Sequence, residues 1–192
     1  PTRWGNGAAS FESYGFDLYR ESTFGLAYSG GFREKFIYGI EANYYHVAIK
    51  DGGSAGTIGF DAGLLFKIHP YVTVGFTSRN INQPVIAHDE LAQVMALGVS
   101  VNMFEPLTIN ADLYKDVRYD TDIRVGAEYE VIHQLFLRVG VASKPSSFSA
   151  GLGFDFGIGM IDYALYTHQD LGVTHAVSAS LHLQRQPIRK IQ

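Results

Sequence analysis

The sequence contains no cysteine, which excludes disulfides, thiolate nucleophiles and cysteine-ligated metals. It also lacks any run near the roughly 18 to 20 unbroken apolar residues that a membrane-spanning helix needs. Its formal net charge of -4 shows no basic surplus to attract a phosphate backbone. A helical membrane protein and a nucleic-acid-binding protein are therefore not expected.

The composition predicts an ordered chain with one domain. With 192 residues, 46% of them hydrophobic, and a mean hydropathy of +0.01, the sequence is too apolar for a disordered protein. The apolar residues recur with a period close to two, which is typical of strands and not of helices. In the segment from Leu107 to Tyr114, for example, every second residue is apolar and its neighbours are mostly polar.

This alternation predicts an all-β fold of about twelve antiparallel strands. The expected strands are 5–17, 20–32, 35–50, 56–67, 70–80, 91–103, 106–116, 121–131, 134–143, 147–156, 159–168 and 172–183. The connections between them alternate between tight turns and longer loops, as in an up-and-down membrane barrel.

Strand length and the distribution of charge favour a transmembrane β-barrel over a soluble sandwich or barrel. Strands of about 10 to 12 residues match a tilted membrane span, whereas soluble strands are nearer 5 or 6. Charged residues avoid the apolar face, where Arg or Lys would cost about 2 to 4 kcal/mol at mid-membrane. They lie on the opposite face, which we expect to line the lumen, either along a path or as a structural charge network: Glu41, Asp61, Arg79, Arg124, Glu128 and Arg138.

No catalytic, cofactor or metal site is expected. The sequence has no G-x-S-x-G nucleophile elbow and no spacing that singles out a triad, so enzymatic activity is not predicted. The seven histidines include no H-x-x-x-H pair. Asp116, Asp120 and Asp122 gather near one loop, where a solvated acidic loop is favoured over a calcium site because the EF-hand ligand order is missing.

The longest connection, from Asn80 to Glu90, is the expected contact site for a partner or ligand on the outer side. It mixes polar and apolar side chains, and loops on a rigid scaffold often carry recognition. The candidate residues are Asn82, Gln83, Pro84, Val85 and Ile86. An alternative interpretation is that its apolar residues fold back over the mouth of the barrel.

Several segments resemble the PorV/PorQ-like proteins of the FadL-like outer-membrane superfamily. These are the run Ser13–Thr23 (SYGFDLYREST), the strand exit Ser78–Pro84 (SRNINQP), the segment Leu91–Gly98 (LAQVMALG), and four stretches that follow one another in the C-terminal third: 137–140, 147–153, 161–164 and 171–178. The resemblance covers most of residues 13–183 and implies a barrel in the bacterial outer membrane.

The resemblance implies two functions. The first is a protein-binding anchor, shuttle or structural subunit of an envelope complex of the type IX secretion kind, with envelope or secreted proteins as partners. The second is transport of hydrophobic small molecules through a lateral opening in the wall, as in the wider superfamily. Membrane lipid is a partner in both cases.

Two departures from the family concern the ends of the chain, and one of them is that the last strand does not stop at a terminal aromatic residue but runs on to residue 192. The glycine-rich N-terminal segment of the family is missing, and about twelve strands stand where the superfamily usually has fourteen, so the chain is expected to be part of a longer barrel. We expect the barrel to occupy residues 1–183 and a basic periplasmic tail to occupy 184–192. In that tail, Arg185, Arg189 and Lys190 are candidates to contact anionic lipid or a partner, with a disordered end as the alternative.

Overall fold

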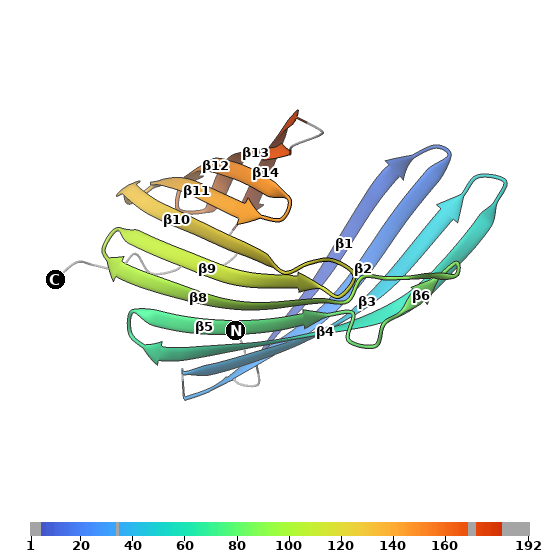
Figure 1. Ribbon diagram of the computed structural model, residues 1–192, viewed down its shortest axis with the longest axis horizontal. Helices are drawn as coiled ribbons and strands as arrows, with labels where there is room; N and C mark the ends of the chain where they lie inside the picture. The colour runs from blue at the N-terminus through green and yellow to red at the C-terminus, as the bar shows by residue number, and fades with distance from the viewer. Residues whose placement is uncertain (1–4, 34, 169–171, 182–192) are drawn as a thin grey trace. The chain divides into compact units, whose positions relative to one another are not determined.

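The computed structural model describes residues 5–33, 35–168 and 172–181. Its strands are β1 (Asn6–Phe16), β2 (Tyr19–Phe32), β3 (Phe36–Ile49), β4 (Gly53–His69), β5 (Val72–Arg79), β6 (Val85–Ile86), β7 (Asp89–Glu90), β8 (Val94–Phe104), β9 (Leu107–Asp116), β10 (Asp122–Ile132), β11 (Leu135–Ser143), β12 (Ser146–Asp155), β13 (Gly159–His168) and β14 (Gly172–Leu181) (Figure 1). Over the described ranges, no helix is long and apolar enough to cross a membrane.

Twelve of these strands form a single antiparallel sheet. Its order is β1-β2-β3-β4-β5-β8-β9-β10-β11-β12-β13-β14, so each strand lies beside the next long strand in the chain. β6 and β7 pair only with each other. Such an order is that of an up-and-down meander in which tight turns or loops join neighbouring strands.

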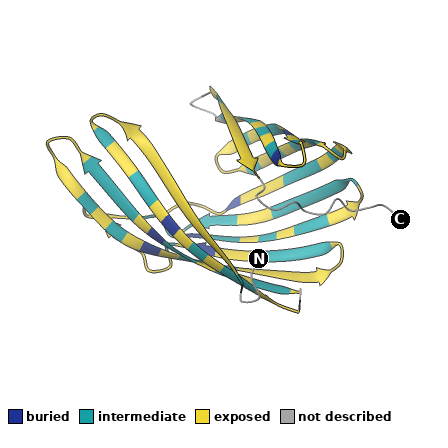
Figure 2. Ribbon diagram, turned by 180° about the vertical axis from the view of Figure 1, so that it is seen from behind, coloured by how far each residue is buried: buried dark blue, intermediate teal, exposed yellow. Residues whose placement is uncertain are grey.

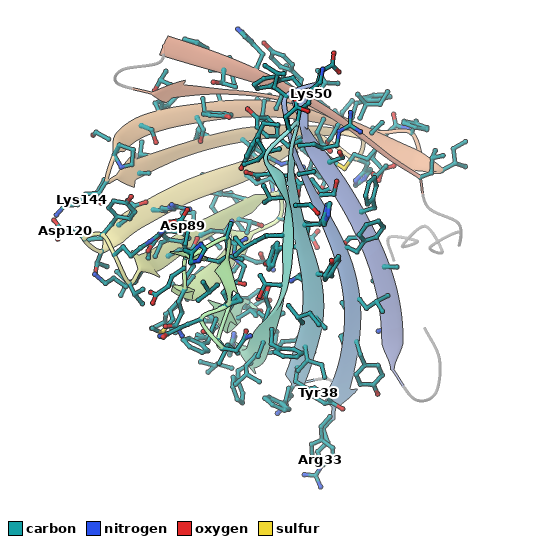
Figure 3. The ribbon with its side chains drawn as sticks, turned by 90° about the vertical axis from the view of Figure 1, so that its right-hand side faces the viewer. Arg33, Tyr38, Lys50, Asp89, Asp120 and Lys144 are labelled. Atoms are coloured by element: carbon teal, nitrogen blue, oxygen red, sulfur yellow. The ribbon has the colours of Figure 1, made fainter. Side chains whose placement is uncertain are left out.

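The chain consists of two compact units. The first comprises residues 1–99 and 112–121, and the second comprises residues 100–111 and 122–192. In the first unit the pairing is long and regular: β2 and β3 pair from Tyr19↔Ile49 to Phe32↔Phe36 without a register shift. Figure 3 shows Arg33 and Tyr38 towards one end of these strands and Lys50 at the other.

Along the strands, the apolar side chains are exposed and the residues between them are more buried, which is the reverse of the pattern in a soluble protein. On β2, Phe24, Leu26 and Tyr28 are exposed, whereas Gly25 between them is buried. In the second unit, Leu137 and Val139 are exposed on β11. The apolar face therefore has no protein cover, which suits a hydrocarbon environment and not water.

The described part of the chain has almost no conventional hydrophobic core. Its buried apolar side chains are Pro84, Ile86 and Val94, the last two at 8% and 7% relative exposure. Three polar residues are also buried, namely Asn43, Ser78 and Asp122. Figure 2 shows most of the sheet as exposed or half-buried. Backbone pairing, and not side-chain packing, is thus the main interaction that joins the strands.

The predicted twelve long strands are confirmed, and most observed boundaries lie within three residues of those expected. The main difference is at β4 and β5: β4 begins at Gly53 and has 17 residues, whereas β5 has only 8. A second difference is the β6–β7 hairpin within the expected loop. The division into a barrel and a tail stays a prediction, because residues 182–192 lie outside the described residues.

Candidate functional site

The unequal lengths of β4 and β5 leave part of one strand without a neighbour. β4 pairs with β3 along its length, from Gly53 to Phe66. It pairs with β5 only from Ala62 to His69, since β5 ends at Arg79. In the described part of the chain, residues 53–61 of β4 therefore have β3 as their only strand partner. An edge of this kind presents backbone donors and acceptors that need other partners.

The first residues of the following loop supply some of those partners. The backbone N–H of Ile81 donates to the carbonyl of Phe60 at 2.9 Å. The side-chain carbonyl of Asn82 accepts a hydrogen bond from Phe60 N at 3.0 Å, and its Nδ2 donates to the carbonyl of Ile58 at 2.8 Å. One amide side chain thus pairs with the β4 edge as a residue of a neighbouring strand would.

Asn80 attaches the same loop to the polar face. Its backbone N–H donates to Asp61 Oδ1 at 2.8 Å, and Asn43 Nδ2 donates to Asp61 Oδ2 at 3.1 Å, so both carboxylate oxygens accept hydrogen bonds. The Asn80 side chain accepts a hydrogen bond from Tyr45 Oη at 3.1 Å and donates to the Ala92 carbonyl at 2.9 Å. The loop is therefore hydrogen-bonded to two strands and to its own far end.

Gly59 makes this close approach possible. A Cβ at this position would lie 2.4 Å from Asn80 Oδ1 and 2.8 Å from Tyr45 Cε2. Any larger residue would force Asn80 or Tyr45 to move. A glycine in a strand often marks such an approach of other groups to the backbone.

The rest of the loop folds into a small hairpin beside β4. Val85 pairs with Glu90 and Ile86 with Asp89, the residue labelled in Figure 3. Pro84 and Ile86 are buried, and β6 contacts β4. The ends of the loop are joined by a hydrogen bond from Leu91 N to the Pro84 carbonyl at 2.9 Å and by a side-chain hydrogen bond from Gln83 to Gln93 at 3.1 Å. We call residues 80–93 the strap.

The strap contains every residue that the sequence singled out as an outer contact. Asn82 and Gln83 already have hydrogen-bond partners, and Pro84 and Ile86 are turned towards protein. Val85 remains 49% exposed. Contact of these residues with an external partner stays a prediction.

The predicted lumen residues fall into two sets, one in each unit. In the first unit, Glu41 and Asp61 are register partners on β3 and β4, and Arg79 is the last residue of β5. In the second, Glu128 and Arg138 are register partners on β10 and β11. Arg124 Nε forms a salt bridge with Asp122 Oδ2 at 2.6 Å. Their role as lumen lining stays a prediction.

Arg138 is the centre of a charge network across four strands. Its Nε donates to Glu128 Oε2 at 2.6 Å, and its Nη1 donates to Asp162 on β13. The strand between, β12, has Gly153 at this point, and a Cβ there would lie 2.7 Å from Asp162 Oδ1 and 3.1 Å from Arg138 Nη1. Glycine thus makes room for the pair to meet across the strand.

Two of the acidic residues near the loop after β9, Asp116 and Asp122, have hydrogen-bond partners within the protein. Asp116 pairs with Arg118 at 3.3 Å, and this hydrogen bond raises the pKa of Arg118 above its ordinary value. The Asp122 carboxylate accepts hydrogen bonds from Ser143 N, Ser143 Oγ and Lys144 N at 2.9 to 3.0 Å, in addition to Arg124. No group of three or more possible metal ligands occurs within residues 5–33, 35–168 and 172–181.

Sequence reasoning missed the residues that hold the strap, namely Asn43, Tyr45 and Asn80. Alternation places Asn43 and Tyr45 on the polar face, and glycine at position 59 signals space opposite them. Their bonds join positions 18 and 35 residues apart, which no local pattern shows. The candidate tail residues Arg185, Arg189 and Lys190 lie outside the described residues.

Comparison with known proteins gives a likeness of fold. Neither a scan against protein-family models nor a search of curated proteins gives a match. Among solved structures, the chain is similar to the toluene transporter TbuX of Ralstonia pickettii, with a TM-score of 0.63 and 15% sequence identity. The match covers 85% of this chain and 68% of that chain. The fold is that of a transmembrane β-barrel. This likeness shows the fold alone, and the FadL-like, PorV/PorQ and type IX assignments stay predictions.

Proposed function

We propose that this protein is a β-barrel of the bacterial outer membrane that transports hydrophobic small molecules. The observation that carries the proposal is the likeness of fold to a toluene transporter over 85% of the chain. The exposed apolar face supports the membrane location, because it presents Phe24, Ile40 and Val139 without protein cover.

The free edge of β4 supports the same function. An apolar solute that enters from outside gains little interaction free energy from the polar face, because that face carries charged residues such as Glu41, Asp61 and Arg138. A break in strand pairing offers a shorter route from the interior to the hydrocarbon layer. Residues 53–61 form such a break, since β5 ends halfway along β4.

The protein-binding role is the weaker of the two hypotheses. It rests on the resemblance to PorV-like proteins, and the structural comparison gives a transporter. The strap residues that were expected to meet a partner are largely engaged with β4 and with each other. Transport is therefore the function that the observations favour.

The test is uptake of radiolabelled toluene by cells that express the protein, compared with cells that carry an empty vector. We expect faster uptake of toluene and no change for a labelled sugar of similar size, which serves as the control. Uptake no faster than that of the empty-vector cells would contradict the proposal. Equal acceleration of toluene and sugar would indicate an open aqueous pore instead.

A further inference from the structure

We propose that the strap is a releasable closure of the break beside β4, and that Asn82 is the positioning residue that holds it shut. This inference rests on the proposed transport function and deepens it by naming the segment that controls lateral passage. The geometry that points to it is the pair of hydrogen bonds from the Asn82 side chain to Phe60 N and to the Ile58 carbonyl.

The strap replaces a strand only over a short stretch. Ile81 and Asn82 engage the β4 backbone at two residues, Phe60 and Ile58. By contrast, β3 pairs with β4 over 14 successive residues from Phe36↔Phe66 to Ile49↔Gly53. The strap therefore has far fewer backbone interactions to break than a true neighbouring strand, so it opens more readily than the rest of the wall.

Packing adds little to hold the strap in place. Asn82 and Gln83 are exposed, and among the described strap residues only Pro84 and Ile86 are buried. Polar bonds at an exposed position exchange readily with water, since a typical hydrogen bond contributes little net free energy. The closure thus depends on a few specific side chains and not on a core.

Backbone strain is concentrated in the same segment. Six described residues other than glycine have positive φ, and four of them are in the strap: Asn80 (52°), Gln83 (49°), Ala87 (49°) and His88 (80°). Left-handed conformations are unfavourable for most residues with a side chain, such as Gln83 and Ala87, and less so for Asn and His. Strain of this kind persists where surrounding contacts impose it and gathers at functional segments that change conformation.

Release of the strap has a defined structural consequence. Loss of the Asn82 contacts leaves Phe60 N and the Ile58 carbonyl without these partners. The first residues of the strap then keep only the hydrogen bonds of Ile81 to Phe60 and of Asn80 to the neighbouring strands, so the strap separates more readily from the β4 edge. The break from residue 53 to residue 61 then opens towards the lipid-facing side, where Ile58 and Phe60 are exposed. A hydrophobic solute passes through the wall in that state.

The first test combines hydrogen exchange with uptake. Asn82→Ala removes both contacts; we expect the Phe60 amide to exchange about tenfold faster and toluene uptake to rise severalfold. Asn102→Ala is the matched control, because it removes a side-chain hydrogen bond, from Thr108, outside the strap. Unchanged exchange in Asn82→Ala would overturn the closure. Faster exchange with unchanged uptake, in cells whose wild-type protein transports toluene, would overturn its role in passage.

A second variant disturbs the strap from the β4 side. Gly59→Ala places a methyl group 2.4 Å from Asn80 Oδ1, so it displaces the strap without altering Asn82. Gly63→Ala is its control on the same strand and face, where the nearest atom to a Cβ is the Phe76 carbonyl oxygen at 3.7 Å. We expect Gly59→Ala to raise uptake as Asn82→Ala does and Gly63→Ala to leave it unchanged. Equal uptake in the two glycine variants would contradict the proposal.

Cross-linking tests the opposite change. The chain has no cysteine, so thiols introduced at Phe60 and Ile81 are the only targets of a short bis-thiosulfonate reagent. Joining these neighbours keeps the strap on β4 and should reduce uptake to the background level. A Leu64→Cys, Phe76→Cys pair joins register partners on β4 and β5 and leaves the strap free, so uptake should persist.

The results separate failure of the closure from failure of transport. Absence of toluene uptake in the wild type and in all variants contradicts the transport function, while exchange at Phe60 still reports whether Asn82 holds the strap. Wild-type uptake that persists after the Phe60–Ile81 cross-link contradicts only the closure.

Discussion

Arg138 Nε lies 2.6 Å from Glu128 Oε2, and the two residues are register partners on neighbouring strands. The same guanidinium reaches Asp162 two strands away on the other side, across Gly153. One cation therefore bridges two carboxylates that come from strands on either side of it. The network joins three strands of the second unit, β10, β11 and β13, and passes across β12.

Loss of the Arg138 cation should destabilise the protein. Arg138→Leu leaves Glu128 and Asp162 close together without their shared partner. Because the three side chains are only 28 to 37% exposed, we expect a loss of about 1 to 2 kcal/mol, between the values for exposed and buried pairs. The measurement is urea unfolding in lipid vesicles.

The control for Arg138 is Arg118→Leu, which removes the ion pair with Asp116. Arg118 is 50% exposed, so its loss should change the free energy of unfolding by less than about 0.5 kcal/mol. Similar losses in the two variants would show that the strand-spanning network contributes no more to stability than an exposed ion pair.

Loss of the Asp122 side chain should lower the free energy of unfolding more than loss of an exposed carboxylate. It is 2% exposed, and its Oδ1 atom accepts hydrogen bonds from the backbone N–H groups of Ser143 and Lys144. Asp122→Ala leaves these donors without their acceptor and should cost about 2 to 4 kcal/mol. Asp122→Asn retains an acceptor oxygen and should cost less. If both variants unfold at the wild-type urea concentration, the carboxylate does not hold this turn.

Alternation of apolar residues was sufficient to predict the main sheet from the sequence. Each long strand places apolar side chains such as Ile123, Val125 and Tyr129 on one exposed face. Register follows because a shift by one residue would turn these side chains to the polar face. The tight turns then left little freedom in the order of the strands, and the twelve-stranded sheet has that order.

The strap was beyond what local patterns could predict. A loop rich in Asn, Gln and Pro is typical of a solvent-exposed connection. Nothing in this pattern indicates that the Asn82 side chain forms a hydrogen bond with Phe60, 22 residues earlier in the sequence. The early end of β5 depends on the same contacts, because Asn80 bonds Asp61 where the next strand pair would otherwise form. Long-range hydrogen bonds of single side chains, and not periodicity, determine this part of the molecule.

The lipid-facing side can be tested with one charge on each face of the same hairpin. Val139 is 52% exposed in the middle of β11, so Val139→Arg should cost about 2 to 4 kcal/mol at the membrane midplane. Ser149→Arg is the control on β12, since Ser149 pairs with Gly140 on the polar face. We expect only Val139→Arg to lower the yield of folded protein in vesicles. The reverse order would mean that the polar face meets the lipid.

The last prediction concerns the turn of the β6–β7 hairpin. Ala87 and His88 both have positive φ between the paired residues Ile86 and Asp89, as in a type I′ turn, which favours Asn-Gly. The variant Ala87→Asn, His88→Gly should therefore relieve about 1 to 2 kcal/mol of strain. Slower hydrogen exchange at residues 85–90 and slower toluene uptake are expected, because an ordered hairpin keeps Ile86 against β4.

Asp51→Gly is the control for that variant. Asp51 has a φ of 61° in the turn after β3, so the change places glycine at a left-handed position away from the strap. It should leave both the exchange of residues 85–90 and toluene uptake as in the wild type. If both variants slow uptake equally, general stiffness of the barrel limits passage. If only the hairpin variant slows uptake, the strain in the strap favours its opening.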